Sequence, residues 1–137
     1  MLPYTSAGNQ SLLALFYADR LWNRLGVAET SGALCGAVAG AGTMSTLGSG
    51  KGIDPTEVRH SQLILLWGNN TRLTNRHLWP FVEEARANGA QVVVIDPVRT
   101  LTADSADWFV QPHAGTDVAL MLAMMHVLVR DDLVDHE

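Results

Sequence analysis

Polar residues that could bind a nucleotide-type ligand follow a short aliphatic run near the middle of the chain. The run ends at Leu66, and Trp67, Gly68, Asn69 and Asn70 come directly after it. Gly68 permits a tight turn, and the start of a following helix offers free backbone N–H groups to a phosphate. An ordinary strand-to-helix turn explains the same residues, because the glycine pattern of a dinucleotide fingerprint is missing. Both interpretations stay open on the residues alone.

A second polar cluster follows the aliphatic run Val92–Ile95. Asp96 stands at the end of that run, where a carboxylate can accept hydrogen bonds from ribose hydroxyls or from a base. The same carboxylate could instead cap the turn before Pro97. Arg99 and Thr102 could add contacts to a phosphate, although such side chains are more often simply solvated. The cluster therefore indicates a second candidate ligand contact, with turn capping as the alternative.

Asp117 and Cys35 are two further candidates for chemistry. Asp117 could receive the N–H groups of a guanine, but capping the helix that begins beside it is the default interpretation. Cys35 is the only cysteine, so the chain can form neither an internal disulfide nor a cysteine-ligated iron–sulfur cluster. It lies in the segment 31–52, where Gly, Ala, Ser and Thr leave room for a bulky cofactor. Cys35 could be a thiolate ligand there, or a small buried hydrophobic residue.

The elements that must position these residues are those of an α/β protein. Uniform aliphatic runs are typical of strands buried on both faces of a parallel sheet, whose ligands lie beyond the carboxyl ends of the strands. We expect strands over 62–67, 91–96 and 108–110, the end of another at 2–4, and helices over 9–25, 75–88 and 118–130. The last helix is apolar nearly all round and should be deeply packed. This order predicts one domain over 1–137, with a Rossmann-like, doubly wound, mostly parallel sheet of about four strands and helices on both faces.

Composition excludes several classes of protein. The chain has 137 residues, of which 47% are hydrophobic and 17% charged, with a net charge of −5. An acidic chain without Lys/Arg clusters is a poor nucleic-acid binder. No stretch approaches the ~18–20 apolar residues of a membrane span. The first residues lack the basic and apolar regions of a signal peptide, which slightly favours a cytoplasmic location.

Together the motifs resemble one family, the molybdopterin oxidoreductases of the dimethyl-sulfoxide-reductase type, which bind bis-molybdopterin guanine dinucleotide. The resemblance runs through nearly the whole chain, and its strength comes from the order and spacing of individually weak motifs. These are Asn23–Gly26, Thr30–Gly42, Leu66–Asn70, Asn75–Pro80, Glu84–Ala90, Val94–Thr100, Ala106–Asp107, Gly115–Asp117 and Met125–Leu128.

The resemblance implies a set of site residues. Cys35 would be the catalytic ligand to molybdenum or tungsten, in a cofactor-facing segment 31–52. Residues 68–74 would hold the diphosphate and pterin side of one guanine dinucleotide, with Asp96 at its ribose or guanine. The implied cofactor-binding residues are Trp67, Gly68, Asn69, Asn70, Thr74, Asp96, Pro97, Arg99, Gly115 and Asp117. The arginine usual directly after Asp-Pro is Val98 here, with Arg99 one step later, which leaves the phosphate contact open.

Members of this family are several times longer than 137 residues. They add an amino-terminal cysteine motif for an iron–sulfur cluster and a carboxyl-terminal β-barrel domain. The resemblance therefore implies an internal fragment that is inactive alone and whose partners are the other domains and a small redox substrate. The parent would catalyse a two-electron redox or oxygen-atom transfer reaction. The alternative is a non-catalytic nucleotide-binding or scaffold module with the same fold; an NAD-type domain is disfavoured by the missing glycine fingerprint.

Overall fold

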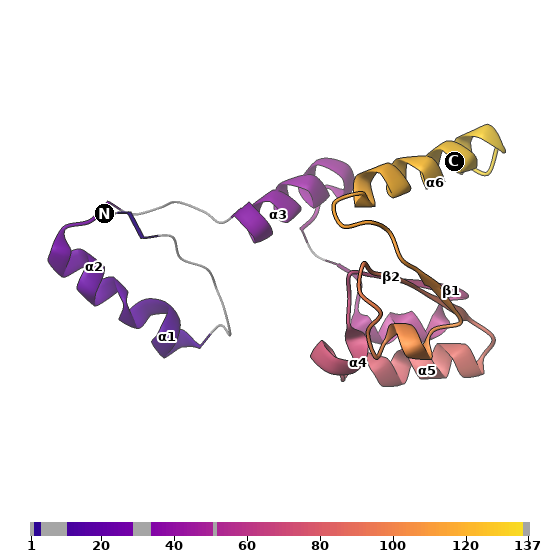
Figure 1. Cartoon of the computed structure of the whole chain (residues 1–137), viewed down its shortest axis with the longest axis horizontal. Helices are drawn as coiled ribbons and strands as arrows, with labels where there is room; N and C mark the ends of the chain where they lie inside the picture. The colour runs from indigo at the N-terminus through magenta and orange to yellow at the C-terminus, as the bar shows by residue number, and fades with distance from the viewer. Residues whose placement is uncertain (1, 4–10, 29–33, 51, 136–137) are drawn as a thin grey trace. The chain divides into compact units, whose positions relative to one another are not determined.

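The chain forms two units, Met1–Gly52 and Ile53–Glu137, in the computed structural model shown in Figure 1. The structure describes residues 2–3, 11–28, 34–50 and 52–135. No helix in these ranges is both long and apolar enough to cross a membrane. The strand end predicted at 2–4 is not found at residues 2 and 3, which are not in a strand, and residue 4 lies outside the described residues.

The first unit contains three helices in its described part. They are α1 (Leu12–Tyr17), α2 (Asp19–Leu25) and α3 (Leu34–Leu47). The single helix predicted over 9–25 is interrupted at Ala18, and α2 ends as expected at Gly26, whose φ is +63°. The Gly- and Ala-rich segment forms the helix α3, which has no buried residue.

The second unit carries the α/β fold. Its elements are η1 (Pro55–His60), β1 (Leu63–Trp67), α4 (Thr71–Thr74), α5 (Trp79–Ala87), β2 (Gln91–Ile95), η2 (Ala103–Ser105), β3 (Trp108–Val110) and α6 (Asp117–Arg130). The helix predicted over 75–88 begins only at Trp79, because Pro80 lacks the N–H that a helix interior requires and is tolerated only in the first turn. Its carboxyl end is as predicted, with Gly89 at φ +96°.

The three strands form one parallel sheet in the order β1-β2-β3. Trp67 pairs with Ile95, and Ile95 pairs in turn with Val110, so all three strands end at the same edge. The α/β class and the parallel pairing of the two aliphatic runs are therefore confirmed. The described residues contain three strands rather than about four.

One face of the sheet packs against α5 and the 3₁₀ helices. Val82 and Ala85 of α5 are completely buried, as are Val92 and Val94 of β2. The cluster of buried residues comprises Ile64, Leu66, Val82, Ala85, Ala90, Val92, Val94 and Ala103. This core holds the carboxyl ends of β1 and β2 side by side.

The opposite face of the sheet is only partly covered. Alternate side chains of a strand point to opposite faces, and Leu63, Leu65 and Trp108 on this face are 56%, 42% and 65% exposed. The prediction that β1 is buried on both faces is therefore wrong, whereas Val93 and Ile95 keep β2 buried on both. A hollow of about 460 Å³ lies between this face and two residues of α6, with the lining Leu63, Leu65, Gln91, Val93, Ile95, Trp108, Val110, Leu120 and Met124.

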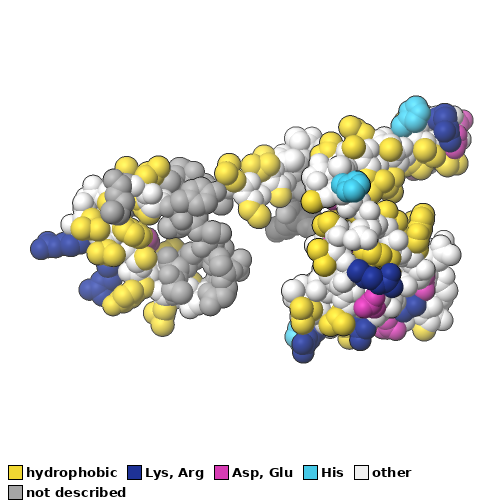
Figure 2. Space-filling view, viewed as in Figure 1, with side chains coloured by type: hydrophobic (Ala, Val, Ile, Leu, Met, Phe, Trp, Pro, Cys, Tyr) yellow, Lys and Arg dark blue, Asp and Glu magenta, His cyan; other side chains and the backbone are white. Residues whose placement is uncertain are grey.

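The predicted deep packing of α6 is also wrong. None of its residues is buried, and Figure 2 shows hydrophobic side chains exposed along it. A helix that is apolar all round needs partners on every side. This unit offers it one sheet face, bordered by Leu120 and Met124.

Candidate functional site

The loop after β1 begins with a glycine in the left-handed conformation. Gly68 has φ +59°, and its N–H donates to the carbonyl oxygen of Ile95 at 2.8 Å. That bond continues the ladder between β1 and β2 by one residue. Gly68 and Asp96 therefore lie side by side at the carboxyl edge of the sheet, where the sequence predicted them.

The two asparagines of this loop use their side-chain oxygens within the protein. Asn69 Oδ1 accepts from the Thr71 hydroxyl at 3.1 Å, and Asn70 Oδ1 accepts from the Thr102 hydroxyl at 2.8 Å. Both threonines are completely buried, while both asparagines are half-buried. In the described part of the chain, the amide nitrogens of the two asparagines have no hydrogen-bond partner. They are available as donors.

Thr74 has a local structural role. Its hydroxyl donates to the Asn70 carbonyl oxygen at 3.1 Å, and its backbone N–H donates to the same oxygen at 2.9 Å. These bonds close the single turn of α4. The hydroxyl retains its lone pairs, so it can still accept a hydrogen bond but its proton is already engaged.

Asp96 caps the turn that follows β2. Its Oδ1 accepts from the Val98 N–H at 2.8 Å, and its own N–H donates to the Val110 carbonyl at 3.2 Å. The side chain is half-buried, and no bond to its second carboxylate oxygen is found in the described part. The turn-capping role is present, and it leaves one carboxylate oxygen for a further donor.

Arg99 is engaged in a surface ion pair. Its Nε donates to Asp104 Oδ1 at 2.7 Å, and its guanidinium lies 5.5 Å from the centre of the Phe109 ring. The two charged side chains are 64% and 55% exposed. Exposed pairs of this kind contribute ~0–1 kcal/mol, so Arg99 can change partner at little cost.

Asp117 does not cap its own helix. Its Oδ1 accepts from the indole Nε1 of Trp67 at 2.7 Å, while Thr116 occupies the N-cap position without a capping bond. Gly115, with φ +83°, provides the left-handed turn before the helix. The start of α6 is thereby tied to the last residue of β1, and the predicted capping role is wrong.

An open hollow of about 650 Å³ lies between the loops that follow β2 and β3. Its lining consists of Pro97, Val98, Gln111, Pro112, His113 and Ala114. The side chain of Gln111 donates from Nε2 to the Pro97 carbonyl at 2.9 Å and so joins the two loops. Of the predicted site residues, only Pro97 lines this hollow.

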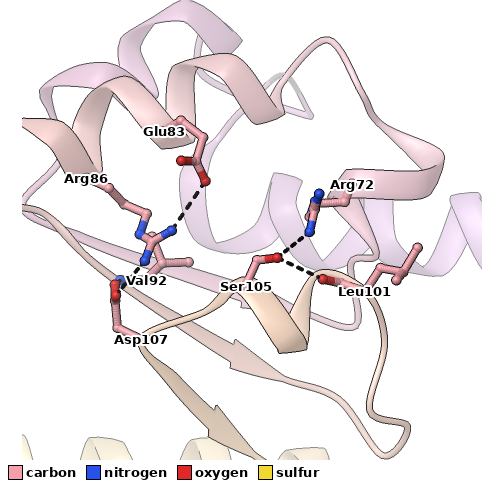
Figure 3. A network of polar contacts seen from close by, with 7 residues as sticks. All are labelled: Arg72, Glu83, Arg86, Val92, Leu101, Ser105 and Asp107. Carbon is pink, nitrogen blue, oxygen red and sulfur yellow. Dashed lines mark hydrogen bonds and ion pairs between the residues drawn. The ribbon is translucent and has the colours of Figure 1, made fainter.

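A polar network that sequence reasoning missed holds α5 against the sheet (Figure 3). Asp107 accepts from the Val92 N–H at 2.7 Å and from Arg86 Nη2 at 2.8 Å, and its N–H donates to the Val92 carbonyl at 2.9 Å. The backbone hydrogen bond from Val92, and then the bond from Arg86, lower the pKa of Asp107 below its ordinary value. Arg86 also reaches Glu83 at 3.3 Å. The motif Ala106–Asp107 was recognised in the sequence, but no structural role was assigned to it.

Arg72 joins α4 to the segment that follows β2 (Figure 3). Its backbone N–H donates to Thr102 Oγ1 at 3.0 Å, and its guanidinium donates to the Ser105 hydroxyl. Ser105 in turn donates to the Leu101 carbonyl at 3.1 Å. Thr102 is wholly buried, so the phosphate contact considered for it in the sequence does not form.

Cys35 lies in α3, where it is a free and exposed cysteine. Within the described ranges there is no group of three or more His, Cys, Asp or Glu side chains that could hold a metal ion. That Cys35 is the protein ligand to the metal stays a prediction.

Comparison with known proteins decides the family. The sequence pattern of the family described as Molybdopterin oxidoreductase matches residues 2–137. This chain belongs to that family. It is 38% identical over 136 residues to the probable oxidoreductase YoaE of Bacillus subtilis, a match that covers 98% of this chain and 20% of YoaE.

Two further relatives have named substrates. The assimilatory nitrate reductase catalytic subunit of Bacillus subtilis is 29% identical over 111 residues, covering 80% of this chain and 16% of the relative. The dimethyl sulfoxide/trimethylamine N-oxide reductase of Rhodobacter capsulatus is 37% identical over 93 residues, covering 61% and 11%. The chain thus spans about a fifth or less of the length of these three relatives. The family predicted from the motifs is confirmed.

Proposed function

We propose that this chain is a cofactor-binding part of a molybdenum- or tungsten-dependent oxidoreductase, and that the carboxyl edge of its sheet binds one arm of bis-molybdopterin guanine dinucleotide. The observation that supports this most is the alignment of the three strand ends, which brings Gly68 and Asp96 together in register. Parallel sheets bind nucleotides at this edge. The parent enzyme would carry out a two-electron redox or oxygen-atom transfer reaction on a small substrate.

The residues at this edge suit a guanine dinucleotide chemically. The amide nitrogens of Asn69 and Asn70 can donate to diphosphate oxygens. Asp96 keeps one carboxylate oxygen for ribose hydroxyls or guanine N–H groups, and Asp117 keeps one beyond its bond to Trp67. Donors near the phosphates and carboxylates near the sugar or base are the arrangement such a ligand requires.

Cys35 is the proposed protein ligand to the metal. When bound, the metal cofactor supplies the redox chemistry, and the chain's part is to bind and orient it. A metal-binding thiolate must be accessible, and Cys35 is exposed on α3. Gly36 and Gly40 of the same helix have no atom within 4 Å of an added Cβ, which leaves space beside the helix for a bulky group.

The test is the substitution Asp96→Ala in the full-length enzyme that we propose contains this chain. Losing hydrogen bonds to a charged acceptor costs ~1.5–3 kcal/mol, so cofactor affinity should fall about 10- to 100-fold. Molybdenum and guanine nucleotide per folded enzyme are the quantities to measure. Glu84→Ala is the matched control, because Glu84 is an exposed carboxylate in the second half of α5, the helix that leads from the end of β1 to the start of β2. Equal cofactor content in both variants would refute the proposed site.

A further inference from the structure

Thr102 is a polar side chain enclosed completely by the protein. It is 0% exposed, and its hydroxyl makes two hydrogen bonds. The oxygen lies 3.0 Å from the Arg72 backbone nitrogen and 2.8 Å from Asn70 Oδ1. The residue therefore links the loop after β1 to the segment after β2 without reaching solvent.

The chemistry of these partners fixes the direction of both bonds. A backbone N–H can only donate, so the Thr102 oxygen accepts from Arg72. Among the described residues, Asn70 is then the sole acceptor available to the hydroxyl hydrogen. Leaving that hydrogen buried without an acceptor would be costly. The atom of Asn70 that faces Thr102 must therefore be the carbonyl oxygen, and the NH₂ group must face away from it.

We propose that Thr102 is a positioning residue that holds the Asn70 amide with its two N–H donors toward the ligand. This inference rests on the proposed function of the loop after β1. It restricts the subsite at Asn70 to hydrogen-bond acceptors, such as phosphate or carbonyl oxygens. A ligand group that can only donate would meet the NH₂ group and be rejected.

The inference predicts a specific pattern of cofactor occupancy in the full-length enzyme. Thr102→Val keeps the shape but removes the hydroxyl, so the Asn70 amide can rotate and occupancy should fall about ten-fold. Thr102→Ser keeps the hydroxyl and should retain occupancy within about two-fold of the wild type. Occupancy is measured as molybdenum and guanine nucleotide per folded enzyme, which removes the contribution of unfolded protein.

A double-mutant cycle separates positioning from general support of the fold. If Thr102 acts through Asn70, then Thr102→Val should cause no further loss of occupancy in the Asn70→Ala background. The amide exchange of Arg72 in the 137-residue chain gives an independent readout: Thr102→Val should accelerate it and Thr102→Ser should not.

Each contrary outcome has a distinct meaning. If Thr102→Val lowers cofactor occupancy equally in the wild type and in the Asn70→Ala background, the positioning role is overturned. The same follows if Thr102→Val and Thr102→Ser lower occupancy equally. Both outcomes leave the proposed cofactor site intact. Full occupancy in Asn70→Ala would remove Asn70 from the cofactor site, and the positioning role would fall with it.

Discussion

The substitution Asp107→Asn should destabilise the second unit measurably. The carboxylate of Asp107 receives one hydrogen bond from the Val92 N–H and one from Arg86. Asparagine has a single side-chain oxygen, so its NH₂ group must face one of the two donors. One of the two hydrogen bonds is therefore lost, and the asparagine NH₂ group is placed against the N–H donor that made it.

The size of the effect follows from the exposure of the partners. A hydrogen bond to a charged group is worth ~1.5–3 kcal/mol. The Arg86 and Asp107 side chains are 29% and 39% exposed, and solvent screening reduces their pair to ~1 kcal/mol or less. Val92 is completely buried, so its hydrogen bond to residue 107 is not screened by solvent, and this bond loses its charge assistance even when the asparagine oxygen accepts it. We expect a loss of about 1.5–2.5 kcal/mol in the free energy of unfolding, which lowers the melting temperature by roughly 5–15 °C.

The pH dependence of unfolding tests the cause. Because the pKa of Asp107 is lowered in the folded protein, its stabilising contribution is complete above the ordinary aspartate pKa of ~3.9 and is lost as the pH falls through the lowered value. The difference between wild type and Asp107→Asn should therefore be constant from pH 7 to about pH 5 and should shrink below pH 4. Thermal unfolding by circular dichroism at several pH values measures it.

Glu83→Gln is the control for this prediction. Glu83 contacts the same arginine at 3.3 Å but is 48% exposed, so its substitution should change stability by less than ~0.5 kcal/mol. A difference between wild type and Asp107→Asn that stays the same at pH 7 and pH 2.5 would refute the electrostatic reasoning. Equal losses of stability in Asp107→Asn and Glu83→Gln would show that the hydrogen bond from the buried Val92 N–H contributes no more to the free energy of unfolding than the exposed ion pair does.

Two other substitutions test local features. Gly68→Ala should cost ~1–2 kcal/mol in chemical denaturation through its left-handed φ of +59° alone, because no atom lies within 4 Å of an added Cβ; Gly68→Asn should cost less, since asparagine tolerates this conformation. A neutral Gly68→Ala would contradict the backbone assignment. Cys35→Ala should abolish turnover of the full-length enzyme without changing the thermal unfolding of the chain, because Cys35 is exposed. Full activity in that variant would transfer the ligand role elsewhere.

The strands were predictable because their signal is local. The runs 63–66 and 92–95 consist of aliphatic residues, a pattern typical of strands in a parallel sheet, although only β2 is covered on both faces. Gly26 and Gly89 directly follow the helix ends expected at residues 25 and 88, and both adopt the left-handed conformation that glycine favours there. The polar residues just after these strands could be assigned to one edge of the sheet, because parallel strands end together.

Long-range contacts accounted for the failures. Asp117 looked like a helix cap, but the indole N–H of Trp67, fifty positions earlier, binds its carboxylate. Thr102 looked like a surface residue, because nothing in its neighbourhood in the sequence indicates that Arg72 and Asn70 enclose it. The apolar sequence of α6 predicted that the helix would be buried, but burial also requires elements that pack against it. The sequence of the helix does not reveal how many such elements the rest of the chain provides.

The two edge strands of the sheet bear on the self-association of the chain at high protein concentration. In the described unit only β2 has a strand on both sides, so β1 and β3 each present a row of backbone N–H and C=O groups. Such edges are templates for strands of other molecules. These two strands also carry the exposed apolar side chains Leu63, Leu65 and Trp108. Pairing of two edges would bury part of this apolar surface and would therefore be favourable. We therefore expect the isolated chain to self-associate as its concentration rises, and we expect charged residues placed on both edge strands to suppress this association.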